Sequence, residues 1–432
     1  MRTLGVKAAS KVRRKMLGLL MRLPGANNSD PAALLARFPD EALVPLRRAA
    51  LDPVPELLEL AAREPVSRLK MPLGLRGWLV TGYDEARTVL AADHRTFSND
   101  FGNMVGKIGI AAEQDPGGLG FADPPDHTRL RHMLTPHFTT RALSRRLPRI
   151  EQIVDEALAD TARLGAGGEP VDLLSSFAFP IASRTIMEIL GVGDEDREAF
   201  RRLSTARFDL SGVAADTLDV IGEAVDLLVP VVARQRTQPQ DGLIGHILAE
   251  YGDDISDVEL AGLADGVLTG GLETTVSMIT LGALVMLNDS SAFDAMRDEA
   301  GVDDFVEELL RYLTVVQVGF PRFAVRDSTV GGKAIFAGDI VICSLSGANR
   351  DVRRGADLDT ADPHREPAGH LAFGHGIHRC VGAELARMEL RLAYPALAKA
   401  FPAMRLAVAA DELAYRDLSV VYGLHSLPVL LS

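Results

Sequence analysis

The residue best suited to chemistry in this sequence is Cys380, which lies in the segment Leu-Ala-Phe-Gly-His-Gly-Ile-His-Arg-Cys-Val-Gly. Gly374 and Gly376 allow a tight loop without side chains, so backbone can lie against a flat cofactor. A helical pattern follows over 381–394 and puts the sulfur at a helix N-terminus, where free N–H donors lower the thiol pKa. Because a thiolate ligand on haem iron favours O–O cleavage, we predict that Cys380 is an iron ligand.

Three other interpretations of Cys380 remain open. A zinc site could use His370, His375, His378 and Cys380, but the paired ligand spacing of structural zinc sites is missing, and a zinc protein would purify colourless. A catalytic cysteine would need a third, orienting group that no spacing indicates. An ordinary buried thiol would leave the glycines unexplained. Cys343, the second of two cysteines, lies in an apolar strand pattern and is predicted to be core.

A second candidate centre lies in a long helical pattern entered at Ser256 with Glu259 three residues later, which is a capping box. Its middle reads Gly-Gly-Leu-Glu-Thr-Thr from Gly270, and two adjacent glycines cost about 1 kcal/mol each relative to alanine. Glu273 beside Thr274 is suited to proton relay. Taken alone, the same residues could equally be a packing site with an incidental acid.

Two further sets of charges have helical spacing. His127 and Arg131 are four residues apart, so they share a helix face, and arginine binds carboxylates well. Glu308 and Arg311 are three apart and can form an ion pair. On their own, both sets could be ordinary solvated charges.

At these residues the chain resembles the cytochrome P450 superfamily, over about residues 53–432. The haem-loop motif Phe-Gly-x-Gly-x-His-x-Cys-x-Gly is met in full from Phe373 to Gly382. The resemblance implies a bound haem b with Cys380 as the metal ligand. Residues implied to contact the cofactor are Phe373, Gly374 and Gly382, and those implied to bind its propionates are His127, Arg131, Arg322 and His378.

The resemblance also assigns roles to the helical motifs. Gly270 and Gly271 would leave room above the iron, and Glu273 and Thr274 would be the catalytic acid–alcohol pair that delivers protons. Glu308 and Arg311 would be a buried pair behind the haem loop, joined by an arginine of the preceding meander. Here that arginine position falls on Thr360, so we predict a looser meander in which Arg353, Arg354 or Arg365 substitutes.

The fold class expected from these patterns is mainly α with a minor β portion. The resemblance specifies the cytochrome P450 fold, a large helical domain plus a small β-rich domain around a buried haem. Helices are predicted at 55–62 and 83–92 and throughout 129–302, with breaks near 165–170 and 238–242. An edge hairpin strand is predicted at 75–81, a long loop at 97–120 and strands at 323–346. We expect a basic, loosely ordered extension at 1–50 and the catalytic domain at 51–432.

Composition restricts partners and location. The net charge of −13 argues against nucleic-acid binding, and two cysteines give no disulfide framework, which favours a cytoplasmic protein. The most apolar segment, 260–287, carries Asp265 and Glu273, so we predict no transmembrane span. Residues 1–25 are basic and could contact a membrane surface or form a loose tail.

The expected reaction is insertion of one oxygen atom from O2 into an apolar or amphipathic small molecule. Pocket walls implied by the resemblance are 97–120, 263–267, 315–320 and 419–422. Electrons would come from NAD(P)H through a separate reductase and an acidic ferredoxin, docking on Arg141, Arg145, Arg146, Arg379, Arg387 and Arg391. Alternatives are a peroxide-driven peroxygenase and a non-catalytic haem-binding sensor or carrier.

Overall fold

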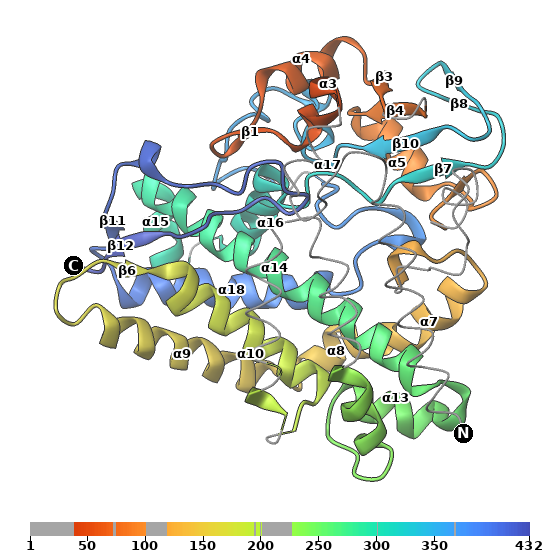
Figure 1. Ribbon diagram of the computed structural model, residues 1–432. Helices are drawn as coiled ribbons and strands as arrows, with labels where there is room; N and C mark the ends of the chain where they lie inside the picture. Colours follow the sequence, from red (N-terminus) through yellow and green to blue (C-terminus); the bar gives the residue numbers. More distant parts are fainter. Residues whose placement is uncertain are drawn as a thin grey trace, which may run out of the picture.

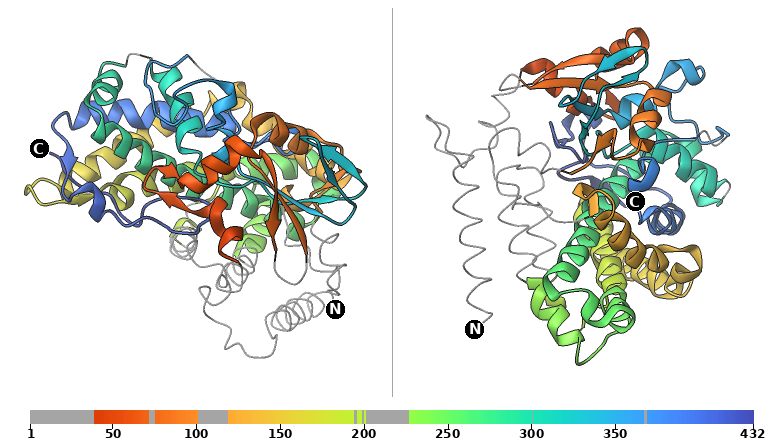
Figure 2. Two further views of the ribbon diagram at one scale, coloured as in Figure 1. Left: turned by 90° about the horizontal axis from the view of Figure 1, so that it is seen from above. Right: turned by 90° about the vertical axis from the view of Figure 1, so that its right-hand side faces the viewer.

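The computed structural model of the 432-residue chain describes residues 39–71, 75–100, 119–193, 196–198, 200, 227–299, 301–366 and 369–432. Long helices form one part of the molecule and a smaller β-rich part lies beside them (Figure 1). The same separation is visible from the side in Figure 2. The predicted fold class, mainly α with a minor β portion, is therefore confirmed.

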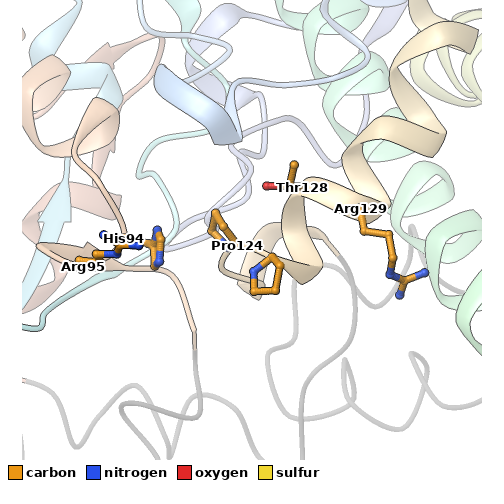
Figure 3. Close-up of a pocket in the computed structure, with 6 residues that line it drawn as sticks. His94, Arg95, Pro124, Thr128 and Arg129 are labelled. Atoms are coloured by element: carbon orange, nitrogen blue, oxygen red, sulfur yellow. The ribbon is translucent and has the colours of Figure 1, made fainter.

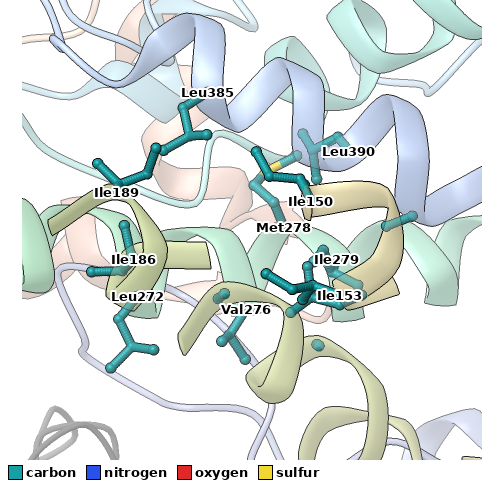
Figure 4. Packing of buried hydrophobic residues seen from close by; sticks show 14 of the residues in the cluster. Ile150, Ile153, Ile186, Ile189, Leu272, Val276, Met278, Ile279, Leu385 and Leu390 are labelled. Atoms are coloured by element: carbon teal, nitrogen blue, oxygen red, sulfur yellow. The ribbon is translucent and has the colours of Figure 1, made fainter. Parts of the chain in front are cut away.

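The helical part is built around α14 (Asp257–Asn288), which packs against α10 (Phe179–Leu190) and α18 (Ala383–Ala400). Helix α9 (Leu147–Leu164) packs on both α10 and α18. Figure 4 shows the side chains that fill the space between these helices, including Ile153 of α9, Ile186 of α10 and Leu390 of α18. Burial of these apolar side chains supplies the main stabilising free energy of this layer.

Helix α14 begins where the sequence predicts. The Ser256 hydroxyl accepts a hydrogen bond from the Glu259 N–H at 3.2 Å, which is one half of the predicted capping box. Among the described helices, α14 is the one long and apolar enough to cross a membrane, but 72% of its most apolar window is buried inside the protein. Its apolar character is explained by its central place in the core.

Helix α18 differs from its predicted limits of 381 and 394. It begins at Ala383 and continues through Pro395 to Ala400. A proline inside a helix costs about 3 kcal/mol. Full burial of Leu397 and Ala398 against the core offsets this cost, a contribution that local sequence preferences do not show.

The main sheet of the β-rich part has the strand order β3-β4-β10-β7-β5. These strands are β3 (Val66–Lys70), β4 (Arg76–Val80), β10 (Ile340–Cys343), β7 (Arg322–Ala324) and β5 (Phe97–Ser98). Strand β4 pairs antiparallel with β3 and parallel with β10. The predicted edge position of this strand is therefore wrong: its second neighbour comes from about 260 residues along the chain. A buried bond from Trp78 Nε1 to Asp339 Oδ2 (2.8 Å) accompanies that pairing.

Helices α4 (Pro55–Arg63) and α5 (Tyr83–Ala91) confirm two predicted helices. The helix breaks near 165 and 240 are also confirmed, because α9 ends at Leu164 and α13 begins at Leu243. The other helices and strands are α3 (Asp40–Leu43), β1 (Arg48–Ala49), β2 (Asp52–Pro53), α7 (Asp126–Leu134), α8 (Thr140–Leu143), β6 (Val171–Asp172), α13 (Leu243–Tyr251), α15 (Ser290–Arg297), α16 (Val302–Leu313), β8 (Ser328–Val330), β9 (Lys333–Ile335), α17 (Leu345–Ala348), β11 (Arg405–Leu406) and β12 (Pro428–Leu430). Single turns are η1 (Val44–Leu46), η4 (Leu119–Phe121), η5 (Thr135–Phe138), the π-turn η6 (Leu174–Ala178), η7 (Gly252–Asp254), η8 (Val352–Arg354), η9 (Gly376–His378) and η10 (Ala410–Glu412).

The possible membrane contact at residues 1–25 and most of the predicted loop at 97–120 lie outside the described residues. Strand β1 contacts the helical core, since Arg48 donates hydrogen bonds to Leu313 O and Thr314 O. The domain boundary expected at residue 50 stays a prediction, and these contacts place Arg48 with the folded domain.

Candidate active site

The loop that carries Cys380 is tightly folded. Gly374 and Gly376 have positive φ values of 68° and 76°, which glycine adopts without strain. The Cys380 N–H donates to Phe373 O at 2.8 Å and closes the loop. A Cβ on Gly376 would overlap the backbone of Leu90, so this glycine permits contact with α5, whereas a Cβ on Gly374 would meet nothing among the described residues. The two glycines therefore have different roles.

Cys380 is exposed, although nearby protein atoms partly desolvate its thiol. Burial raises its pKa, while the Gly382 N–H and the charges of Arg131, Arg379 and Arg387 lower it, and the net direction is upward. The N–H at the helix start therefore lowers this pKa as expected, but desolvation outweighs its effect. The donors are nevertheless in place, and a metal ion deprotonates a coordinating thiol outright.

Four basic side chains that are far apart in sequence converge beside this loop. The rings of His127 (α7) and His378 (η9) lie 4.2 Å apart between centroids. Burial and then the charges of His127, Arg322 and Arg131 lower the pKa of His378 to about 3. Burial lowers the pKa of Arg131, while Cys380 lies close enough for the charge of its thiolate to act in the raising direction. The structure thus brings together all four basic residues singled out by sequence.

This cluster fits an anionic group. The Nε2 atom of His127 is buried without a hydrogen-bond partner among the described residues, which is costly unless a ligand supplies one. Arg322 is 3% exposed and donates from Nη1 only to Phe320 O at 2.9 Å among the bonds described. Arg131 and Arg322 both act electrostatically on His378, which its low pKa leaves neutral, and two arginines brought together in this way favour a bound anion. Asp123 is an acid that already acts on His127 and Arg322. Two carboxylates, such as the propionates of a haem, match this requirement, and the residues present therefore fit a haem.

A buried ion-pair network lies behind the loop. Arg311 (1% exposed) donates to both oxygens of Glu308 at 2.7 Å, and Asp362 N–H and Arg365 Nε also reach the Glu308 carboxylate at 3.1 and 2.9 Å. Arg365 therefore takes the place of the arginine that is missing at position 360. Thr360 itself contributes its backbone carbonyl, which accepts a hydrogen bond from Arg311. The other two candidates have different partners: Arg353 pairs with Asp351 and Glu85, and Arg354 lies over the Tyr83 ring.

A second network that the sequence did not indicate joins α16 to the haem-loop motif. Arg387 donates to both oxygens of Glu307 at 2.5 and 2.9 Å, and its guanidinium lies 4.8 Å from the Phe373 ring centroid. His370 Nδ1 accepts the Ala372 N–H, so its other nitrogen is free to donate to Glu307 at 3.1 Å. Glu307 could have been found only as an acid beside Glu308, which is a weak signal.

The middle of α14 places its two glycines on different surfaces. A Cβ on Gly271 would overlap Ile186 of α10, whereas a Cβ on Gly270 would meet nothing among the described residues. Gly271 thus lets α14 pack closely on Ile186 of α10, and only Gly270 matches the expectation of open space. Thr274 Oγ1 donates to Gly270 O at 2.5 Å.

Glu273 has a partner that the sequence did not predict. Arg416 Nη1 lies 3.0 Å from Glu273 Oε1, and the two side chains are 5% and 15% exposed. Gly423 allows this approach, because a Cβ there would lie against Ser277 of α14. Arg416 is 143 residues from Glu273 and lies in an irregular C-terminal segment, so no periodicity could reveal the pair.

Three of the six arginines predicted to form the ferredoxin-docking face have acidic partners within this chain. Arg387 pairs with Glu307, Arg391 with Asp303, and Arg146 with Glu188 and Asp241. Arg141, Arg145 and Arg379 are exposed and form no ion pair with another residue in the part of the chain that the structure describes. Acidic partners thus offset the charge of three of the six arginines, and the docking face itself stays a prediction.

A surface pocket of about 570 Å³ lies at the start of α7 (Figure 3). Its lining residues are His94, Arg95, Pro124, Pro125, Thr128 and Arg129. None of the predicted site residues lines it. The pocket and the cation cluster both border on α7 but have no lining residue in common.

Comparisons with known proteins agree on one family. A sequence model of cytochrome P450 matches residues 231–403. Cytochrome P450 165B3 of Amycolatopsis orientalis is 40% identical over 394 residues, covering 89% of this chain and 97% of that protein. The monooxygenase PikC of Streptomyces venezuelae is 38% identical over 384 residues, covering 88% and 91%.

Solved structures give the same result. OxyE, a cytochrome P450 involved in teicoplanin biosynthesis, is 36% identical with a TM-score of 0.81, and the alignment covers 91% of this chain and 99% of OxyE. The mycinamicin hydroxylase MycCI of Micromonospora griseorubida is 32% identical with a TM-score of 0.79, covering 89% and 98%. The chain therefore belongs to the cytochrome P450 family of haem-dependent monooxygenases.

Proposed function

We propose that this cytochrome P450 holds its haem iron through Cys380 and inserts one oxygen atom from O2 into an apolar or amphipathic small molecule. The observation that carries the proposal is the convergence of four basic side chains, around the unpartnered Nε2 of His127, beside the loop that presents Cys380. His127, Arg131, Arg322 and His378 are the proposed propionate ligands. Phe373, Gly374 and Gly382 are the proposed neighbours of the porphyrin.

The bound haem supplies dioxygen binding and electron transfer. The proposed task of Glu273 and Thr274 is to move protons toward the reaction site. The Thr274 hydroxyl donates to Gly270 O, which leaves its oxygen free to accept a proton or a hydrogen bond. Arg416 holds the Glu273 carboxylate through Oε1 at 3.0 Å, and this ion pair fixes the position from which Glu273 would exchange a proton with Thr274 or water.

The proposed substrate is a bulky intermediate of antibiotic biosynthesis, of peptide or macrolide type. Support comes from the relatives: StaH is a P450 from glycopeptide antibiotic A47934 biosynthesis, and MycCI was solved bound to mycinamicin VIII. Exposed apolar side chains on two of the expected pocket walls, Phe320 and Val420, each 51% exposed, suit such a molecule.

Electrons are proposed to come from NAD(P)H through a ferredoxin reductase and an acidic ferredoxin in the cytoplasm. Arg141, Arg145 and Arg379 are the exposed arginines of the expected docking face that have no ion-pair partner in the described part of the chain. Long-range attraction between such cations and an acidic partner raises the association rate and weakens with salt. A reduction rate that does not change with ionic strength would contradict this docking mode.

The decisive test of the proposed function is the optical spectrum of the purified protein, reduced under carbon monoxide. The wild type should show the thiolate-ligated haem band, and Cys380→Ser should lose it. Cys343→Ser is the matched control, because Cys343 is buried in β10 with its pKa raised by burial to about 12. A haem protein that shows no spin-state change with any compound of a macrolide and peptide library would favour the sensor or carrier alternative. Full peroxide-driven activity in Thr274→Ala would favour the peroxygenase.

A further inference from the structure

Arg48 of β1 is inserted between the N-terminal part of the domain and the end of α16. Its Nη2 donates to Leu313 O and Thr314 O at 2.9 and 3.1 Å, and its Nε donates to Gln317 Oε1 at 2.7 Å. A cation is favourable at these carbonyls, because they end a helix. Burial and the nearby charge of Arg350 lower the pKa of Arg48 to about 10, so it stays charged at neutral pH. Arg48 thus binds the two residues just before the segment Val315–Phe320 and its third residue, Gln317.

Gln317 is fully buried and joins three parts of the chain. Its Nε2 donates to Leu46 O at 2.9 Å and to Ser419 O at 2.8 Å. Its backbone N–H donates to Val420 O, and its carbonyl accepts from Leu345 N–H, both at 2.9 Å. A buried amide with all these bonds satisfied fixes its neighbours, because breaking any of them leaves a buried polar group without a partner.

The two segments that Gln317 joins are expected pocket walls. Val315–Phe320 presents Phe320, and Ser419–Tyr422 presents Val420, and both side chains are 51% exposed. Phe320 also meets the Phe121 ring edge-on at 4.8 Å between centroids. The Phe320 carbonyl accepts from Arg322 of the cation cluster at 2.9 Å. The wall is therefore continuous with the candidate haem site at one end and held by Arg48 and Gln317 at the other.

We infer that Arg48 and Gln317 are positioning residues that fix the segments Val315–Phe320 and Ser419–Tyr422, and that they determine how tightly large ligands bind beside the haem. This inference rests on the proposed haem function. A wall that is already held in place imposes no ordering cost when a ligand contacts it. Small ligands that do not reach the two wall segments gain nothing from their being held in place. Arg48 and Gln317 therefore favour the binding of large ligands over small ones.

The test compares imidazole with 4-phenylimidazole, each titrated into the haem-loaded protein and followed by the change in its optical spectrum. Arg48→Met keeps the side-chain length and removes the hydrogen bonds. Its Kd for imidazole should stay within about twofold of wild type, and its Kd for 4-phenylimidazole should rise about tenfold, since the wall must be ordered on binding. Arg47→Met is the matched control, because Arg47 is exposed and pairs only with Asp40 among the described residues.

Two further variants separate positioning from general stability. Gln317→Leu should reproduce the selective loss, and the double variant should add little to it, since both residues act through one contact. Arg48→Lys keeps the charge at the end of α16 but loses the bond from Nε, so its affinity for 4-phenylimidazole should fall by less than that of Arg48→Met. This variant provides the test if Arg48→Met does not fold.

The inference would be overturned if Arg48→Met bound both ligands more weakly by the same factor, or if it bound both as tightly as the wild type does. A wild-type protein without any optical response to imidazole would instead overturn the proposed haem function, and the inference with it.

Discussion

Removing Arg365 tests how the loop of this cytochrome P450 is supported. Arg365→Met deletes the bond from Nε to Glu308 (2.9 Å) and the bond from Nη2 to Asp357 O (2.7 Å). Glu308 keeps both bonds from Arg311 and the one from the Asp362 N–H, so its charge is not left alone. The expected effect is therefore intermediate: larger than for an exposed ion pair and smaller than for loss of the whole buried pair.

The magnitude follows from burial. A hydrogen bond to a charged group contributes about 1.5–3 kcal/mol. The Arg365 side chain is 17% exposed, so water replaces part of what is lost. We expect Arg365→Met to lower the free energy of unfolding by about 2 kcal/mol. Glu308→Ala leaves the fully buried Arg311 without a carboxylate and should cost about 3–5 kcal/mol, with loss of haem retention.

The assay is guanidinium unfolding followed by circular dichroism, together with the ratio of haem to protein absorbance. Arg163→Met is the control, because Arg163 is 72% exposed and its ion pair with Asp160 should contribute about 0.5 kcal/mol or less. If Arg365→Met unfolds at the same denaturant concentration as Arg163→Met, Arg365 is not the functional substitute for the missing arginine. Normal haem content in Glu308→Ala would refute the supporting role of the pair itself.

Three other predictions concern α14 and α16. Gly271→Ala should destabilise the protein by about 1–3 kcal/mol through overlap with Ile186. Gly270→Ala should instead stabilise it by about 1 kcal/mol, because its Cβ meets nothing among the described residues and alanine is the better helix former, and it should weaken ligand binding beside the haem. Equal unfolding free energies for the two variants would contradict the assignment. Burial raises the pKa of Glu307, but the hydrogen bonds from Arg387 and His370 lower it to about 2 overall. The stability that Glu307 contributes is therefore present above about pH 4.5 and is lost as the pH falls toward 2. Glu307→Gln should flatten acid unfolding in this window, and an unfolding curve that superimposes on that of the wild type would disprove this role. Thr274→Ala should divert electrons from product to hydrogen peroxide, measured as peroxide formed per NAD(P)H consumed, and unchanged coupling would exclude Thr274 from the relay.

The sequence by itself determined the parts whose signals are local. The loop from Phe373 to Gly382 depends on two glycines with positive φ and on a helix that follows at once, and both are written in adjacent residues. The start of α14 at Ser256 is equally local, because a hydroxyl at the N-cap binds an N–H three residues away. Helical periodicity also placed α4 and α5 correctly.

Only the tertiary structure decided which distant partners meet. Three arginines could have replaced the one missing at Thr360, and the fold brings Arg365 to Glu308 while Arg353 turns to Asp351. The partner of Glu273 comes from Arg416, and the second neighbour of β4 comes from β10. Periodicity specifies which face of a helix or strand is buried, but the residue it is buried against depends on how the whole chain packs. The support of the Cys380 loop was therefore undetermined until the packing of α16 against the meander was known.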